Sequence, residues 1–246
     1  MGRKFDDYVE YLSDYLKDKP NLAILLDYDG TLTPIVQHPD LAVIPPNAKE
    51  VLEKLAQIPE IFIAIISGRN VLNVKSMVGI NTLTFAGNHG LEVLYPDGST
   101  YEHKLPKDFE VQVRTMVKKL EETVVRDGAW IENKGASLTF HFRECPESKR
   151  AEIESGARKI IEEAGFKVGN AHMALEARPQ VDWNKGTVAV LLLEQKFGSD
   201  WKDKAKVIFV GDDTTDEDAM KALKGNSATF RIAKDCTIQT HADKIS

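Results

Sequence analysis

Three short apolar segments, each ended by polar or acidic residues, constrain the fold more than any other feature of this sequence. They are LAILLDYDG at 22–30, IFIAIISGR at 61–69 and KVIFVGDD at 206–213. Continuous aliphatic and β-branched runs of this length are typical of strands buried on both faces of a parallel sheet. Helical patterns lie between or after them, at 45–58, 184–198 and 215–225. Alternating strands and helices predict an α/β core, doubly wound around a mostly parallel sheet.

The middle of the chain departs from this alternation. After a hairpin turned at Asp97-Gly98, the pattern reads helix, two strands, helix, two strands. The strand SLTFHFR in this region alternates apolar and polar residues, as expected for a sheet with one solvated face. We therefore predict a small α+β module inserted at residues 105–177, which leaves residues 1–104 and 178–246 as one discontinuous core domain.

Composition and charge exclude several classes of protein. Hydrophobic residues make up 42% and charged residues 28% of the 246 positions, which is typical of a globular protein. The net charge of −6 argues against a nucleic-acid surface, and no apolar run approaches the ~20 residues that a membrane helix needs. The N-terminal segment lacks a signal-peptide core, and we expect Cys145 and Cys236 to be reduced and unpaired. We expect a cytoplasmic protein that binds neither nucleic acid nor membrane.

Polar side chains gather at the carboxyl ends of the three strands, where open α/β sheets bind their ligands. The residues concerned are Asp27, Asp29, Ser67, Asp212, Asp213 and Asp216. If the strands are neighbours, five carboxylates crowd one edge of the sheet, and a hard divalent cation, Mg²⁺ by preference, is the simplest compensation. Either acidic stretch alone could equally be a turn or a helix start. Two such stretches, each ending an apolar strand, favour the metal site.

These residues resemble the four motifs of haloacid-dehalogenase-type phosphatases: DYDGT, SGR, a lysine at a helix start, and GDDTTDED. Within that superfamily, LLDYDGTLTPI, AGNHG, EARP, NKG and GDDTTDEDAM resemble trehalose-6-phosphate phosphatases, in order and over nearly the whole chain. The resemblance implies a haloacid-dehalogenase-like core with an inserted cap. It also implies Mg²⁺-dependent hydrolysis of trehalose 6-phosphate to trehalose and inorganic phosphate through an aspartyl-phosphate. Association with a trehalose-phosphate synthase is compatible with it.

The resemblance assigns roles to the core residues. Asp27 would be the nucleophile, and Asp29 the general acid and then the general base. Ser67 would bind a phosphoryl oxygen, and Lys185 would neutralise the transferring group. A cation at a helix start is otherwise disfavoured by the helix dipole. Asp212 would ligate Mg²⁺ together with Asp27 and the backbone carbonyl of Asp29, whereas Asp213 and Asp216 would hold it through water.

Substrate-binding residues are implied in two core loops and in the insert. They are Arg69, Asn88, His89, Glu132, Lys134, Arg143 and Glu176. Arg69 could reach the substrate or brace the acids, and the sequence does not distinguish the two. Without the resemblance, Glu132, Lys134 and Arg143 would be an exposed sheet face with paired charges.

Three alternatives remain open. The same core chemistry would serve another sugar phosphate, such as sucrose phosphate or mannosyl-phosphoglycerate. A non-catalytic domain could bind the sugar phosphate and regulate a partner, although degenerate copies usually lose one of the motif residues. A phosphotransferase would use the same aspartyl-phosphate but return the group to sugar.

Overall fold

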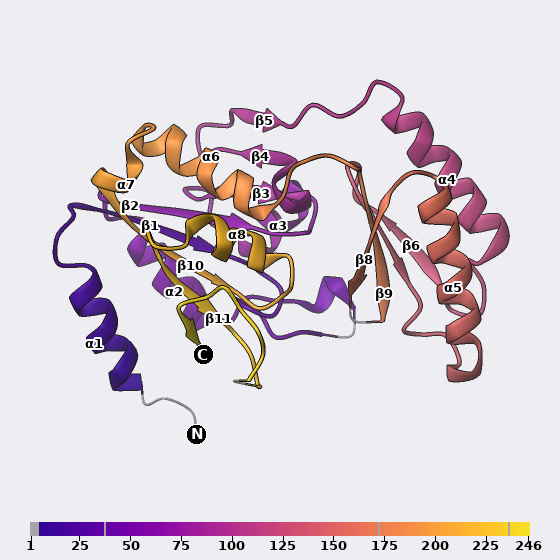
Figure 1. The fold of residues 1–246 in the computed structure, drawn as a ribbon, viewed down its shortest axis with the longest axis horizontal. Coiled ribbons are helices and arrows are strands. Elements are labelled where there is room, and N and C mark those ends of the chain that lie inside the picture. Colours follow the sequence, from indigo (N-terminus) through magenta and orange to yellow (C-terminus); the bar gives the residue numbers. More distant parts are fainter. Residues whose placement is uncertain (1–4, 37, 172, 236) are drawn as a thin grey trace. The chain divides into compact units, whose positions relative to one another are not determined.

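The computed structural model describes residues 5–36, 38–171, 173–235 and 237–246. The chain forms two compact units, the first comprising residues 1–102 and 183–246 and the second residues 103–182. In Figure 1 the chain leaves the first unit after strand β5 (Thr100–Glu102) and re-enters it before helix α6 (Lys185–Phe197). The second unit is longer at both ends than the predicted insert at 105–177.

The first unit is built on an eight-stranded sheet. From one edge to the other its strands are β12 (Lys244–Ile245), β11 (Ala228–Arg231), β10 (Ala205–Gly211), β1 (Asn21–Leu26), β2 (Ile61–Ile66), β3 (Thr84–Gly87), β4 (Glu92–Leu94) and β5. Neighbouring strands from β12 to β3 pair in parallel, and β3, β4 and β5 pair antiparallel. The three apolar segments form β1, β2 and β10, which are adjacent in the sheet, so the predicted mostly parallel α/β core is confirmed.

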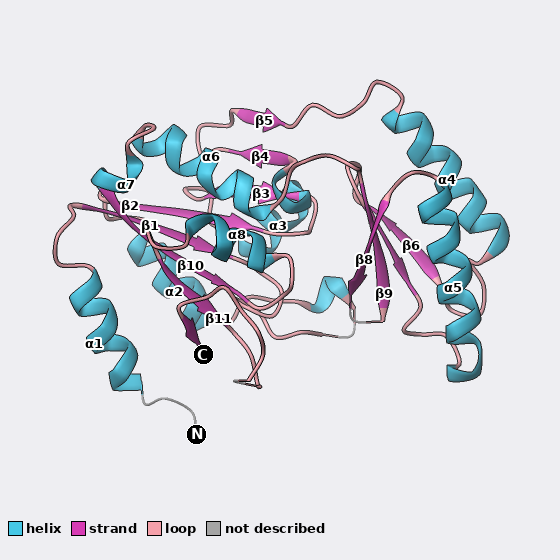
Figure 2. Ribbon diagram, in the orientation of Figure 1, coloured by secondary structure: helices cyan, strands magenta, loops and turns pink. Residues whose placement is uncertain are grey.

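Helices cover both faces of this sheet (Figure 2). Helices α2 (Pro46–Leu55) and α3 (Val71–Val78) contribute to one hydrophobic cluster, and α6 and α8 (Asp216–Leu223) contribute to the other. Leu25 and Leu26 of β1 belong to opposite clusters, because successive residues of a strand point to opposite faces. Burial on both faces explains why these strands read as continuous apolar runs.

The remaining elements complete the description of this unit. They are helices α1 (Phe5–Tyr15) and α7 (Trp201–Lys204) and the 3-10 turns η1 (Pro39–Leu41) and η2 (Asn88–Gly90). Within the described ranges, no helix is long and apolar enough to cross a membrane. Cys145, in the second unit, is a free and buried thiol, as expected, whereas Cys236 lies outside the described residues.

The second unit is a two-layer α+β module that follows the predicted order of elements. Its four strands, all paired antiparallel, are β6 (Trp130–Asn133), β7 (Leu138–His141), β9 (Ala174–Arg178) and β8 (Lys167–Ala171). Helices α4 (Phe109–Thr123) and α5 (Glu147–Glu163) share a hydrophobic core with one face of this sheet, to which the sheet contributes Leu138, Phe140 and Leu175. The alternate residues therefore occupy the opposite face, which is the polar one.

Candidate active site

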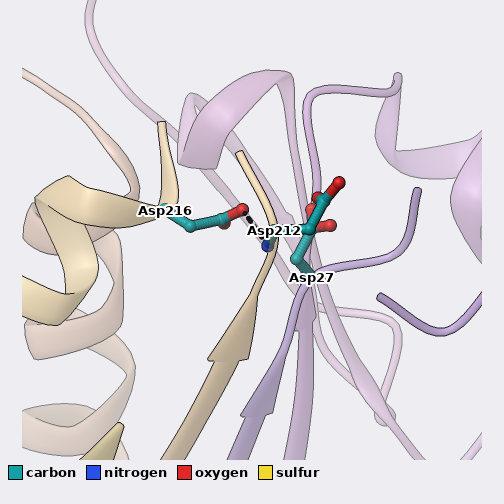
Figure 3. A group of neighbouring side chains, drawn as sticks. All are labelled: Asp27, Asp212 and Asp216. Atoms are coloured by element: carbon teal, nitrogen blue, oxygen red, sulfur yellow. Dashed lines mark hydrogen bonds between the residues drawn. The ribbon is translucent and has the colours of Figure 1, made fainter. Parts of the chain in front are cut away.

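Three acidic side chains meet at the carboxyl ends of β1 and β10. Asp27 follows β1 directly, and its N–H donates to the Val210 carbonyl of β10 at 3.0 Å. Asp212 follows β10, and Asp216 is the first residue of α8. One carboxylate oxygen from each of Asp27, Asp212 and Asp216 lies within 4.8 Å of the others (Figure 3). The parallel pairing of adjacent strands thus brings together acids from distant parts of the sequence.

Two glycines make room for these carboxylates. Gly30 has φ +86°, and a Cβ atom there would lie 2.0 Å from Oδ2 of Asp212. A Cβ atom at Gly211 would lie 2.3 Å from Cγ of Asp216. Side chains at these positions would collide with the acidic cluster, so the glycine of DYDG serves close packing as well as the turn.

Lys185 bridges two of the acids from the start of α6. Its Nζ donates to Oδ1 of Asp27 and to Oδ1 of Asp216, each at 2.7 Å, and all three side chains are buried. Asn184 fixes the start of this helix, because its side chain accepts from the N–H groups of Gly186 and Thr187. Burial by itself lowers the pKa of Lys185, but the charges of Asp216 and Asp27 outweigh it and raise that pKa above the ordinary value. Lys185 therefore remains an ammonium.

The cluster carries more negative charge than Lys185 can balance. Burial, and then the charge of Asp216, raise the pKa of Asp27 well above its ordinary value, although Lys185 opposes them. Burial, with the charges of Asp216 and Asp213, raises the pKa of Asp212 to about 6. Oδ1 of Asp212 is buried and forms no hydrogen bond with any described residue. An unbonded carboxylate oxygen in an all-oxygen acidic cluster fits a divalent cation.

Asp216 organises the loop that carries Asp212. Its Oδ2 accepts the N–H groups of Asp212 and Asp213 at 3.0 and 2.9 Å, while its Oδ1 accepts from Lys185. These three hydrogen bonds occupy the carboxylate and leave Asp27 and Asp212 as the better direct ligands.

Two of the five expected carboxylates are engaged elsewhere. Arg69 donates to both oxygens of Asp29, at 2.6 and 2.7 Å, and also to the Pro39 carbonyl. The sequence left open whether Arg69 contacts the substrate or braces the acids. In the structure it braces Asp29. Asp213 is exposed, and its Oδ1 accepts the N–H of Thr214 at 2.6 Å. The side chains of Asp29 and Asp213 are thus not part of the group formed by Asp27, Asp212 and Asp216, and have Arg69 and Thr214 as their partners.

Ser67 and the AGNHG loop lie beside each other at the ends of β2 and β3. The Asn88 N–H donates to the Arg69 carbonyl at 2.7 Å, and the His89 N–H donates to the Ser67 carbonyl at 2.9 Å. Asn88 and His89 are both buried and both left-handed, with φ of 49° and 57°. Such backbone strain costs about 1–3 kcal/mol per residue and concentrates at functional sites. The loop is also held toward α6, since Trp183 donates to the Gly90 carbonyl at 2.8 Å.

Two residues that contact the predicted site residues were not themselves among the sequence candidates. Arg231, at the end of β11, donates to the Asp213 carbonyl and pairs with Glu217 at 3.2 Å. It braces the acidic loop from the neighbouring strand. His141 of β7 stacks on Trp130 with ring centroids 4.0 Å apart, and its Nε2 lies 3.0 Å from Oε2 of Glu132. The alternation of SLTFHFR predicts that His141 lies on the polar face. The sequence pattern could therefore have identified it as a candidate.

The insert residues implied by the resemblance lie on or beside the polar face of the second unit. Glu132 and Glu176 flank Thr139 in register across β6, β7 and β9. Nζ of Lys134 lies 3.7 Å from Oε1 of Glu176. Arg143 lies two residues after β7, and its carbonyl accepts from Arg150 at 3.0 Å. Glu132, Lys134 and Glu176 thus form one charged surface within this unit.

Residues 25–245 match the model of the trehalose-phosphatase family. The chain is 33% identical over 221 residues to trehalose-phosphate phosphatase B of Arabidopsis thaliana, covering 86% of this chain and 58% of that protein. It is 32% identical over 203 residues to the trehalose-phosphate phosphatase of Mycobacterium bovis, covering 82% and 51%. The chain therefore spans little more than half the length of these relatives.

A solved structure has a similar fold. The C-terminal domain of trehalose-6-phosphate phosphatase from C. albicans superposes with a TM-score of 0.79 at 23% identity, covering 96% of this chain and 90% of that one. Together with the sequence matches, this confirms the resemblance predicted from the motifs.

Proposed function

The chain belongs to the trehalose-phosphatase family, and from this membership we propose that it hydrolyses trehalose 6-phosphate to trehalose and inorganic phosphate. The observation that carries the proposal is the buried cluster in which Lys185 bridges Asp27 and Asp216 beside Asp212. A catalytically silent domain has no need to keep a buried nucleophile, a paired ammonium and an unbonded carboxylate at one sheet edge. That argument favours a phosphatase over a regulatory domain.

In the proposed reaction Asp27 attacks the phosphorus, and the bond from phosphorus to the sugar oxygen breaks. Lys185 neutralises charge on the transferring group, and Ser67 donates a hydrogen bond to a phosphoryl oxygen. Asp29 protonates the departing sugar oxygen and then takes a proton from the water that hydrolyses the aspartyl-phosphate. Asp29 is paired with Arg69 in the structure, so this role requires the pair to open when substrate binds.

We propose Mg²⁺ as the divalent cation, because carboxylate and carbonyl oxygens around a phosphoryl group are the ligands it prefers. Asp27, Asp212 and the backbone carbonyl of Asp29 would hold it, with Asp213 and Asp216 acting indirectly. When bound, the ion would shield the negative charge that otherwise keeps the carboxylate and the phosphate dianion apart.

We propose that the second unit, whose predicted bounds were 105–177, acts as the cap that selects the sugar. Glu132, Lys134, Arg143 and Glu176 would bind sugar hydroxyls through charge-assisted hydrogen bonds, which a polar disaccharide needs more than apolar contacts. Asn88 and His89 would contribute from the core. If these residues instead suit another sugar phosphate, the core chemistry is unchanged.

The test is phosphate release from a panel of trehalose 6-phosphate, sucrose 6-phosphate, mannosyl-phosphoglycerate and glucose 6-phosphate, with Mg²⁺ and with EDTA. We expect the highest kcat/KM for trehalose 6-phosphate and no release in EDTA. A higher kcat/KM for another member of the panel would identify that sugar phosphate as the substrate instead. Binding without phosphate release would favour the regulatory alternative. Transfer of phosphate to added sugar, without its release as inorganic phosphate, would indicate a phosphotransferase.

We also propose that the protein works in the cytoplasm, where a charged sugar phosphate is retained because it does not cross membranes unaided. Association with a trehalose-phosphate synthase is a further proposal. Co-elution of the purified chain with that synthase would support it.

A further inference from the structure

We propose that Arg178 is a further substrate-binding residue, whose guanidinium donates hydrogen bonds to hydroxyl groups of the sugar. This inference rests on the proposed function and deepens it. Arg178 is the last residue of β9 in the second unit. It lies within the EARP motif, but the resemblance assigned it no role.

The alternation of β9 places Arg178 on the polar face. Leu175 and Ala177 belong to the hydrophobic core shared with α4 and α5. Glu176 and Arg178 therefore occupy the opposite face, since successive residues of a strand alternate. Arg178 thus shares its face with Glu176, which the proposed function assigns to sugar binding.

Nε of the Arg178 guanidinium has no hydrogen-bond acceptor among the residues that the structure describes. Its Nε lies 3.6 Å from Oε2 of Glu176, an ion-pair distance that is too long for a hydrogen bond. Nε is buried, and no residue in the described ranges accepts a hydrogen bond from it. By contrast, Arg150 and Arg158 of the same unit donate at 2.6–3.1 Å to carbonyl or side-chain oxygens. Buried guanidinium donors without acceptors are rare, because leaving them unsatisfied is destabilising.

The position of the guanidinium explains what it can bind. A Cβ atom at Gly169 of β8 would lie 3.4 Å from Nη2 of Arg178, so the guanidinium lies over a position that has no side chain. Beside it, Glu176 has Lys134 at 3.7 Å on its other oxygen. The surface therefore offers a carboxylate between two cations, which suits neighbouring hydroxyls that both donate and accept hydrogen bonds. The carboxylate disfavours a phosphate dianion at the same place, so we assign Arg178 to the uncharged part of the substrate.

The experiment compares Arg178→Met and Arg178→Lys with the matched control Arg158→Met, which removes an arginine that already has partners. The kcat and KM values are measured for trehalose 6-phosphate and for p-nitrophenyl phosphate, and circular dichroism confirms folding. We expect Arg178→Met to raise KM for trehalose 6-phosphate about 10- to 100-fold, with kcat changed less than KM. Its kcat/KM for p-nitrophenyl phosphate should stay within about twofold of wild type, because charge-assisted contacts to sugar are absent there.

Arg178→Lys separates hydrogen bonding from charge. A lysine keeps the positive charge beside Glu176 but lacks the forked donors of a guanidinium. The KM of Arg178→Lys should therefore lie between the wild-type value and that of Arg178→Met. Full recovery by lysine, an unchanged KM in Arg178→Met, or equal losses on both substrates would overturn the inference. Failure of the wild-type chain to hydrolyse trehalose 6-phosphate, with activity on other sugar phosphates, would instead refute the proposed substrate. In that case the same KM comparison on the preferred sugar phosphate decides the role of Arg178.

Discussion

Replacing Lys185 by methionine tests the electrostatic core of the site. The side chain of Lys185 bonds both Asp27 and Asp216, whose side chains are 6% and 0% exposed. Methionine has a similar length and is apolar, so it removes the ammonium and leaves two buried carboxylates without it. Removing one partner of a buried ion pair destabilises a protein by about 3–5 kcal/mol, because the remaining charge is uncompensated.

The measurement is urea unfolding in EDTA at pH 8, compared with wild type and with Lys54→Met. Lys54 pairs with Glu50 at 2.7 Å, but both side chains are well exposed, so this control should change stability by less than about 1 kcal/mol. For Lys185→Met we expect a loss of about 3–5 kcal/mol, which corresponds to a decrease in melting temperature of about 6–20 °C. Phosphate release should be abolished.

The pH dependence separates this explanation from a simple packing defect. Burial already raises the pKa of Asp27, and removing Lys185 raises that pKa further. A carboxyl whose pKa is higher in the folded state binds protons on folding, so stability falls as pH rises between the unfolded and folded pKa values. The deficit of Lys185→Met should therefore shrink at pH 5, by up to about 1.4 kcal/mol per pH unit for each such group. A deficit below about 1 kcal/mol at pH 8, or one that grows on acidification, would refute the reasoning.

Three further predictions concern single positions. Asp27→Asn should abolish phosphate release while preserving the fold seen by circular dichroism; turnover that survives it would exclude Asp27 as the nucleophile. Gly30→Ala should lower Mg²⁺ affinity, measured by calorimetry, at least about tenfold, because its Cβ would lie 2.0 Å from Oδ2 of Asp212 at a φ of +86°; unchanged affinity would show that the loop relaxes freely. Lys134→Ala should raise KM for trehalose 6-phosphate about tenfold or more and affect p-nitrophenyl phosphate much less. Equal losses on both substrates would contradict sugar contact by Lys134.

The strands that build the site could be predicted because their apolar runs are long and end sharply. Leu25 and Leu26 pack on opposite faces, so a continuous run was the correct signal for a doubly covered sheet. Once β1 and β10 are neighbours, Asp27 and Asp212 must lie at the same edge. This much follows from strand pairing alone.

The partners of each acid could not be predicted, since they depend on side-chain conformations across long sequence separations. Arg69 binds Asp29 from forty positions away in the chain, and the motif SGR does not say which way its arginine points. Likewise, a lysine at a helix start looks unfavourable until Asp216 is seen to lie beside it, in the first turn of another helix. The role proposed for Arg178 could not be predicted either, because an arginine that ends a strand is normally solvated.

The distribution of partners identifies where a cation is needed. Asp27 and Asp216 share Lys185, Asp29 is held by Arg69, and Asp213 accepts from Thr214. Within the described ranges, the side chain of Asp212 alone among these acids has neither a hydrogen bond nor an ion pair, and its Oδ1 is buried. An unmatched buried charge raises the free energy of the folded state, and burial with neighbouring acids raises the pKa of Asp212 to about 6 accordingly. Each of the other acids has a hydrogen-bond or ion-pair partner within the protein, whereas Asp212 has none within the described ranges. A bound cation would compensate the charge of Asp212 and so remove the destabilisation at that position.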